Sequence, residues 1–198
     1  MSLSQLCSGC LVVLLILGFG APVQPESNKT IPKAGDRLAE ISLPLPIAPE
    51  QRAYLGLAPM AAGNFTLATT AADLVVEQIF SMYCPHCQRE APKVNQLFTA
   101  LQKRPESAPR IRLLGIGVGN SPMEVEVFRK TYSIAFPLFP DGDFTVHKQL
   151  GEVRTPFFFA FRPGDAEPLR LCLAHLGPFE DVDGFVDRLN TLAMKKAP

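Results

Sequence analysis

The 198-residue sequence lacks tryptophan, has only three histidines and contains no block rich in Lys and Arg. Its 19 basic and 19 acidic side chains balance to a formal net charge of 0. Nucleic-acid-binding proteins carry clustered positive charge, so the sequence indicates no nucleic-acid partner. It also shows no internal repeat. With 47% hydrophobic residues over this length, we expect one globular domain with a sizeable core.

The N-terminal segment has no charged side chain before Glu26, and it contains the apolar run LVVLLILGFG followed by small residues. This composition is typical of an export signal, and residues 1–21 are its predicted extent. About 20 uncharged residues can also span a bilayer, so an uncleaved membrane anchor is the alternative. Both readings predict a periplasmic or other extracytoplasmic domain, tethered to the inner membrane in the second case.

Residues 22–33 form a proline-rich stretch that we interpret as a linker, which leaves residues 34–198 as the folded domain. The run from Gly63 to Phe80 first alternates and then becomes continuously apolar, as in a strand that enters a sheet. Apolar residues at helical spacing follow it. RIRLLGIGVG predicts a second buried strand, and Ser121 with Pro122 marks the start of a second helix.

The C-terminal part contains the strand patterns RTPFFFAF and LRLCLAHLG, separated by the turn residues RPGD. This arrangement predicts a β-hairpin. A short strand and a helical turn are expected before it, in FPLFPDGDFTVHKQLG, and an amphipathic helix after it. Strands and helices in this order indicate an α/β domain.

The stretch FSMYCPHCQREAP places Cys84 and Cys87 three positions apart where the first helix should begin. A thiolate at a helix N-terminus faces unpaired N–H groups and the positive end of the helix dipole. Such sites lower a cysteine pKa from about 8.5 to roughly 3.5–7.5. We therefore expect Cys84 to attack as a thiolate, and Cys87, lying deeper and protonated, to resolve the mixed disulfide.

His86 stands between the two cysteines. Its ring can donate a hydrogen bond to the sulfur of Cys84 or carry positive charge beside it, which stabilises the thiolate. Because a stable reduced pair makes a strong oxidant, His86 is predicted to tune the pair in that direction.

A CxxC pair can also serve chemistry other than disulfide exchange. Haem attachment would need a histidine after the second cysteine, where Gln88 stands. Structural zinc takes four ligands and no second CxxC exists, yet a redox chaperone that binds a soft metal through Cys84 and Cys87 stays open. A peroxiredoxin-like peroxidase is less well supported: Ser81 could supply its hydroxyl, but Glu77 replaces its proline.

Three motifs together resemble the exported TlpA/ResA-like thiol-disulfide oxidoreductases, which have a thioredoxin fold. CPHCQREAP matches their C-x-x-C-x-x-E-x-P pattern, AGDRLAEISL their opening segment, and VRTPFFFAF the strand that begins with a cis-proline. The resemblance runs from about Ala34 to the C-terminus. It implies a mixed central β-sheet flanked by helices on both faces.

The resemblance also implies roles for individual residues. Cys84 would attack, Cys87 would resolve, and Glu90 would handle the proton of the buried thiol. Pro156 would be cis, with Thr155 beside the sulfurs to bind an extended substrate.

The dipeptide Pro85–His86 looks like that of the DsbA-type oxidases, and Tyr83 stands where the TlpA/ResA-like group usually has tryptophan. The expected partners are protein thiols or disulfides and a membrane or periplasmic redox protein. We expect a monomer that needs no metal and no cofactor besides the Cys84–Cys87 disulfide.

Overall fold

A computed structural model describes residues 30–58, 62–163 and 169–195. The predicted signal or anchor at residues 1–21, and the predicted linker up to residue 29, lie outside the described residues. Among the helices in the described part of the chain, none is long and apolar enough to cross a membrane.

The described residues form short strands and helices in the order expected for an α/β domain. The strands are β1 (Arg37–Leu38), β2 (Ser42–Pro44), β3 (Asn64–Thr66), β4 (Leu74–Phe80), β5 (Ile111–Val118), β6 (Leu138–Asp141), β7 (Phe157–Arg162) and β8 (Leu169–Leu176). The helices are α1 (Pro49–Leu55), the 3₁₀ turn η1 (Leu67–Thr69), α2 (Pro85–Gln102), α3 (Pro122–Thr131), α4 (Thr145–Gln149) and α5 (Val182–Met194).

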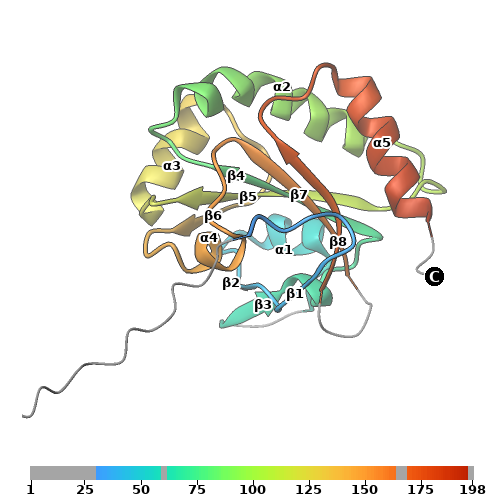
Figure 1. The fold of residues 1–198 in the computed structure, drawn as a ribbon, viewed down its shortest axis with the longest axis horizontal. Coiled ribbons are helices and arrows are strands. Elements are labelled where there is room, and N and C mark those ends of the chain that lie inside the picture. Colours follow the sequence, from blue (N-terminus) through green and yellow to red (C-terminus); the bar gives the residue numbers. More distant parts are fainter. Residues whose placement is uncertain (1–29, 59–61, 164–168, 196–198) are drawn as a thin grey trace, which may run out of the picture.

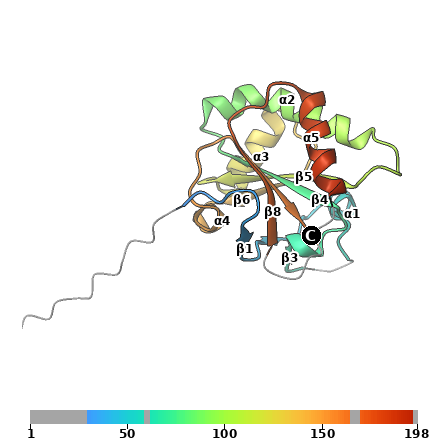
Figure 2. The ribbon, with the colours of Figure 1, turned by 45° about the vertical axis from the view of Figure 1, so that its right-hand side comes forward.

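The central sheet has the strand order β1-β8-β7-β4-β5-β6 (Figure 1). β4, β5 and β6 run parallel, whereas β7 lies antiparallel between β4 and β8. α2, α3 and α5 pack on one face of this sheet, and α1 and α4 pack on the other (Figures 1 and 2). The expected thioredoxin-like fold, with a mixed sheet between two helical layers, is confirmed.

The single strand expected from Gly63 to Phe80 is wrong, because the chain turns in its middle. β3 pairs with β2 in a separate two-stranded sheet, and η1 then redirects the chain into β4. The hydroxyl of Thr69 donates to the Thr66 carbonyl at 2.8 Å, and that of Thr70 to the Leu67 carbonyl at 2.7 Å. Such local hydrogen bonds compete with strand pairing.

The other expected elements are present. Ser121 caps α3 through a capping box with Glu124, and Pro122 occupies its first turn. β7 and β8 pair antiparallel as the predicted hairpin. Side chains of β7 alternate between the two faces: Phe157, Phe159 and Phe161 enter the core on the α1 and α4 side, and Phe158 enters the core beneath α2 and α5.

Candidate active site

Cys84 lies just beyond the carboxyl end of β4, at the start of α2. It is the N-cap residue, and its Sγ accepts a hydrogen bond from the Cys87 backbone N–H at 3.4 Å. Pro85 fills the first helical position, where the missing N–H of proline costs nothing. The residue types around CPHC therefore place one sulfur at the positive end of an 18-residue helix.

Two side-chain amides hold the turn that precedes Cys84. The Met82 backbone N–H donates to Oδ1 of Asn120 at 2.9 Å, and the Met82 carbonyl accepts from Nε2 of Gln88 at 2.7 Å. Asn120 is fully buried just beyond β5. Neither role was predicted from the sequence, in which the one available signal is a polar residue, Asn120, two positions after a buried strand.

The loop before β7 brings Thr155 to the same sulfur. Sγ of Cys84 lies 3.4 Å from the Thr155 carbonyl oxygen, to which its thiol donates, and the Thr155–Pro156 peptide bond is cis. These residues are separated by more than 70 positions. The structure thus brings Cys84, Cys87, Thr155 and Pro156 together, as the resemblance implied.

The two thiols differ in environment. Burial alone would raise the pKa of Cys84, but hydrogen bonds from the Thr155 side chain and from the backbone N–H groups of Cys87 and His86 outweigh it and lower this pKa. Cys87 is fully buried, and desolvation with the nearby Cys84 sulfur raises its pKa to about 12. Cys84 therefore ionises more readily than Cys87, which keeps its proton at neutral pH.

Glu90 lies one helical turn after Cys87 and is also buried. Burial raises the pKa of its carboxyl group, while Lys93 and the Phe179 backbone N–H oppose that rise. Its Oε1 has no hydrogen-bond partner. Residues three apart on a helix have Cβ atoms about 5–6 Å apart, so this carboxyl group is a neighbour of the buried thiol.

The ring of His86 contacts a side chain of the next turn of α2. Its Nδ1 lies 2.9 Å from Nη2 of Arg89, and both side chains are exposed. The His86 group that contributes to the pKa of Cys84 is the backbone N–H.

Glu77 and Gln78 are both buried in β4 but point to opposite faces of the sheet. Gln78 shares the face of Val76 and Phe80, whose core cluster includes Cys87. Glu77 shares the face of Val75 and Ile79, and neither carboxyl oxygen has a partner. Desolvation, with a smaller contribution from Asp141, raises the pKa of Glu77 to about 8.

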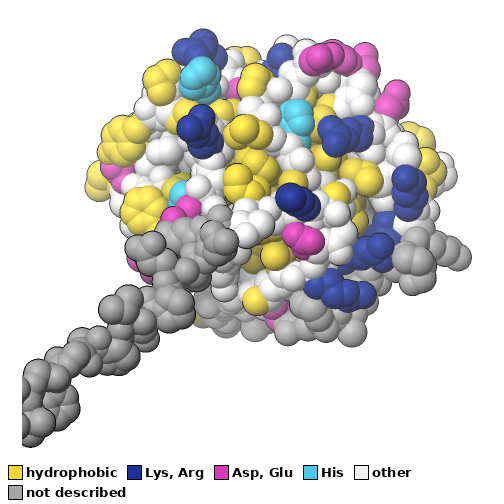
Figure 3. All heavy atoms as spheres, viewed as in Figure 1, with side chains coloured by type: hydrophobic (Ala, Val, Ile, Leu, Met, Phe, Trp, Pro, Cys, Tyr) yellow, Lys and Arg dark blue, Asp and Glu magenta, His cyan; other side chains and the backbone are white. Residues whose placement is uncertain are grey.

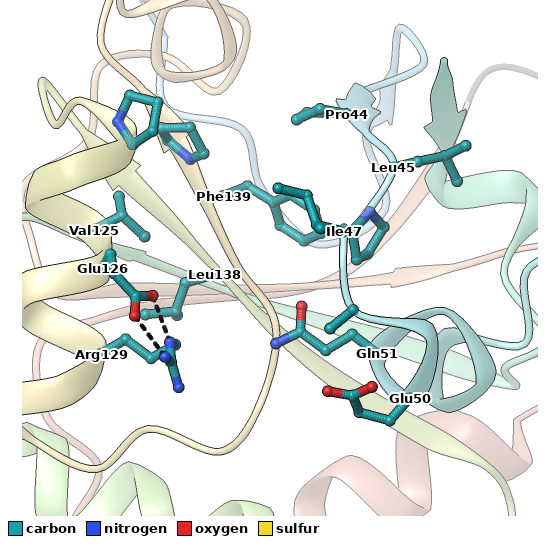
Figure 4. A pocket seen from close by; sticks show the side chains of 14 residues that line it. Pro44, Leu45, Ile47, Glu50, Gln51, Val125, Glu126, Arg129, Leu138 and Phe139 are labelled. Atoms are coloured by element: carbon teal, nitrogen blue, oxygen red, sulfur yellow. Dashed lines mark hydrogen bonds and ion pairs between the residues drawn. The ribbon is translucent and has the colours of Figure 1, made fainter. Parts of the chain in front are cut away.

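A third cysteine in the described part of the chain lies away from the CPHC turn. Cys172, on β8, packs against the core cluster that contains Cys87. Within the described ranges, no group of three or more His, Cys, Asp or Glu side chains could hold a metal ion. A cleft of about 470 Å³ separates residues 44–51 from α3 and β6 (Figure 4), and neither cysteine nor histidine lines it.

A family model decides the relationship, because it matches residues 48–170, more than half of the chain, including the CPHC turn and Pro156. The chain belongs to the AhpC/TSA family. No match is found among curated protein sequences.

Solved structures similar to this AhpC/TSA-family chain have low sequence identity. A DsbF homologue from Corynebacterium diphtheriae is 18% identical, with a TM-score of 0.55, and the match covers 85% of this chain and 96% of that one. A thioredoxin-family thiol:disulfide interchange protein from Chlorobium tepidum is 16% identical, with a TM-score of 0.54 and coverage of 82% and 97%.

A secreted disulfide oxidoreductase from Mycobacterium tuberculosis is 18% identical, with a TM-score of 0.50 and coverage of 73% and 99%. At these identities the matches establish the fold. They confirm the thioredoxin-like fold that the resemblance implied.

Proposed function

We propose that this protein is an exported thiol-disulfide oxidoreductase that exchanges electrons with protein substrates through Cys84 and Cys87. The observation that carries the proposal is the contrast between the two sulfurs. Cys84 lies at a helix N-terminus with a lowered pKa and a half-buried side chain, whereas Cys87 is fully buried with a pKa of about 12. This contrast suits a two-step exchange.

In the reducing direction, the Cys84 thiolate attacks one sulfur of a substrate disulfide. The substrate S–S bond breaks, a mixed disulfide forms, and the released substrate thiolate takes a proton. Cys87 then loses its proton and attacks the sulfur of Cys84, which releases the second substrate thiolate. The products are a Cys84–Cys87 disulfide and a substrate dithiol, so two electrons have moved to the substrate. Oxidation of a substrate follows the same steps in reverse.

Glu90 is proposed to accept the proton of Cys87 in the second step. A thiol with a pKa of about 12 needs a nearby base, and burial has raised the pKa of Glu90 toward that of a useful one. The cysteine pair carries the electrons itself, so no further cofactor is required. Substrate backbone is proposed to pair beside Thr155 and Pro156, next to Sγ of Cys84.

The proposed location is extracytoplasmic, with residues 1–21 as a cleaved signal or a membrane anchor. One structural relative is described as secreted. The proposed partners are protein thiols or disulfides and a membrane or periplasmic redox protein, and the protein is proposed to act as a monomer.

The deciding experiment compares single cysteine variants. Cys84→Ser should lose exchange with both glutathione disulfide and an unfolded protein substrate. Cys172→Ser is the matched control, because Cys172 lies on β8 rather than at the α2 N-terminus, and it should keep the wild-type rate. Retained exchange in Cys84→Ser would overturn the assignment of the nucleophile.

The direction of electron flow follows from the reduction potential of the pair. A value near −120 mV would identify a disulfide donor, and one near −270 mV a reductant. His86→Ala should move the potential toward the reducing end if the imidazole acts on the sulfur. An unchanged potential would mean that the helix N-terminus and Thr155, and not the imidazole, stabilise the Cys84 thiolate.

A peroxiredoxin-like peroxidase is a second candidate, favoured by the AhpC/TSA match and by the Ser81 hydroxyl, which lies 3.4 Å from Nδ2 of Asn120. Stoichiometric consumption of hydrogen peroxide, lost in Ser81→Ala, would support it. The soft-metal alternative predicts an ion that survives dialysis of the reduced protein, measured by elemental analysis.

A further inference from the structure

Three arginines lie in a row across neighbouring strands of the central sheet. Arg170 on β8 is paired with Arg37 on β1 and with Arg162 on β7, and both pairings are antiparallel. Residues directly opposite one another in such a pair share a face of the sheet, with Cβ atoms about 4.5–5.5 Å apart. We name Arg37, Arg170 and Arg162 the arginine row.

The arginine row lies on the face of the sheet that α5 covers. Side chains alternate along a strand, and the neighbours of the row, Leu38, Leu171 and Phe161, belong to the core on the other face. In agreement, Nη2 of Arg162 donates to the Leu192 carbonyl of α5 at 2.6 Å. Lys and Arg side chains gather on the right of the molecule in Figure 3, where Figure 1 places β8 and the end of α5.

The charge of the arginine row is unmatched within the described residues. Like charges directly opposite one another in a sheet are destabilising. In the described part of the chain, no carboxylate forms an ion pair with an arginine of the row. Asp36, which precedes Arg37, instead accepts a hydrogen bond from the Lys33 backbone N–H at 2.8 Å. Nε of Arg162 is buried without a hydrogen-bond partner.

A cleft of about 570 Å³ lies against the arginine row. Arg162 and Arg170 line it together with Lys195, the C-cap residue of α5, and Ala34 and Leu192 add apolar atoms. Volumes of about 300–1,000 Å³ are typical of sites for small organic molecules. The cleft therefore offers several cationic side chains and an apolar wall to one ligand.

We propose that this cleft binds a phosphate monoester of a small organic alcohol through the arginine row. Such a phosphate carries a charge of about −1.5 to −2 at neutral pH and three acceptor oxygens. A guanidinium group presents its N–H donors in a fork that matches two of these oxygens, so neighbouring arginines can share one phosphate. A carboxylate, with a single charge, would neutralise less of the row.

The cleft is remote from the cysteine pair, so the inference goes beyond the proposed thiol exchange. β7 runs antiparallel to β4 with Phe161 opposite Val75, which places Arg162 near the end at which β4 begins. Cys84 follows the other end of β4. Changes in the arginine row can therefore be tested for phosphate binding and for disulfide exchange separately.

Isothermal titration calorimetry of the full chain tests the inference with two ligands that present the same phosphate group. Glycerol 3-phosphate represents a soluble ligand, and a short-chain phosphatidic acid represents a membrane headgroup. At least one should bind, and more weakly as salt rises, because ions screen the charges. Glycerol and short-chain phosphatidylcholine are the control ligands. Tighter binding of phosphatidic acid than of glycerol 3-phosphate would assign the site to lipid, and the reverse order to a soluble phosphate.

Single variants locate the binding. Arg170→Gln should weaken binding at least tenfold, because hydrogen bonds between charged partners are lost. Lys195→Gln, at an exposed position, should weaken it roughly threefold. Arg188→Gln is the matched control, because Arg188 is an exposed arginine of α5 that does not line the cleft, and it should bind as the wild type does. All three variants should react with glutathione disulfide at the wild-type rate.

Three outcomes would overturn the inference. The wild type could bind neither phosphate ligand, Arg170→Gln could bind as tightly as the wild type, or Arg188→Gln could weaken binding as much as Arg170→Gln. Binding that appears only in Asp165→Asn/Glu167→Gln would also contradict it, since these two acids, outside the described residues, would then be the partners of the row. Failure of the wild type to react with glutathione disulfide would refute the proposed function but not the phosphate site.

Discussion

The two faces of the central sheet each contain a buried carboxyl group, but in different surroundings. On the face covered by α2, Glu90 neighbours a thiol and is moderated by Lys93 and the Phe179 backbone N–H. On the opposite face, Glu77 has no hydrogen-bond partner at either oxygen. Desolvation raises both pKa values. The same physical effect suits Glu90 to the role of a base that we propose for it on one face, and on the other it should make the stability of the core sensitive to pH.

The largest expected effect tests whether the two cysteines on the α2 face carry out the exchange. Cys84→Ser should lose all measurable exchange, because no thiolate remains at the helix terminus. Cys87→Ser should still attack and then stop, since the resolving thiol is gone. The trapped mixed disulfide should be visible by mass spectrometry of the intact protein. Free turnover by Cys87→Ser would contradict the proposed order of the two cysteines.

The second effect concerns the opposite face and appears in stability. The folded protein keeps a proton on Glu77 up to pH about 8, whereas the unfolded chain loses it near 4.5. The favourable contribution of the protonated form is full below pH 4.5 and is lost as pH rises to about 8. At about 1.4 kcal/mol per pKa unit, the upper limit of this loss is about 5 kcal/mol.

Urea unfolding of the wild type and Glu77→Gln at pH 5, 6.5 and 8 measures this loss. The variant cannot ionise at this position, so its stability should vary less with pH. The exposed Glu106→Gln serves as the control and should follow the wild type. Identical pH profiles for the wild type and Glu77→Gln would show that ionisation of Glu77 does not cause the loss of stability.

The third prediction compares Glu90 with Glu77 in the same reaction step. Glu90→Gln should slow attack by Cys87 on the mixed disulfide about 100-fold at pH 7, the lower end of the range for proton transfer by a positioned group. Glu77→Gln should leave this step unchanged. Stopped-flow mixing with a fluorescent mixed disulfide resolves the step. Equal slowing by both variants would show that Glu90 has no special role in this proton transfer.

The smallest effect concerns Thr155. Removing its side-chain hydrogen bond in Thr155→Ala should raise the pKa of Cys84, because that bond favours the thiolate. A hydrogen bond of about 1 kcal/mol corresponds to roughly a fivefold loss of thiolate below the pKa. Thiolate absorbance against pH measures it. Thr155→Ser should retain the wild-type titration, and a shift in both variants would point to backbone movement instead.

Much of the fold could be predicted from the sequence because local chemistry dictates it. Ser121 with Pro122 defines the start of α3, and CPHC lies where β4 gives way to α2. The faces of Glu77 and Gln78 could not be assigned, because all seven residues of β4 are buried and no alternation remains to read. The face toward which each side chain points depends on how β4 pairs with β5 and β7.

Local sequence also predicted the part of the candidate site whose residues are adjacent in the chain. The residues that come from distant segments were harder to predict. Thr155 and Pro156 were found through a family motif, not through any local pattern. Asn120 and the contact of Tyr83 with Glu124 depend on how the β5–α3 turn packs beside the β4–α2 turn. Packing between distant turns leaves no periodic signal in the chain.

The position of β7 in the sheet has a consequence for biosynthesis. β4 lies between β5 and β7, and β7 is among the last strands to be synthesised. While the chain is being made, Cys84 and Cys87 therefore exist before Thr155 can reach them and before β4 has its second neighbour. A nascent chain has two ordinary thiols. The part of their difference that comes from Thr155 arises only when the C-terminal third has been added.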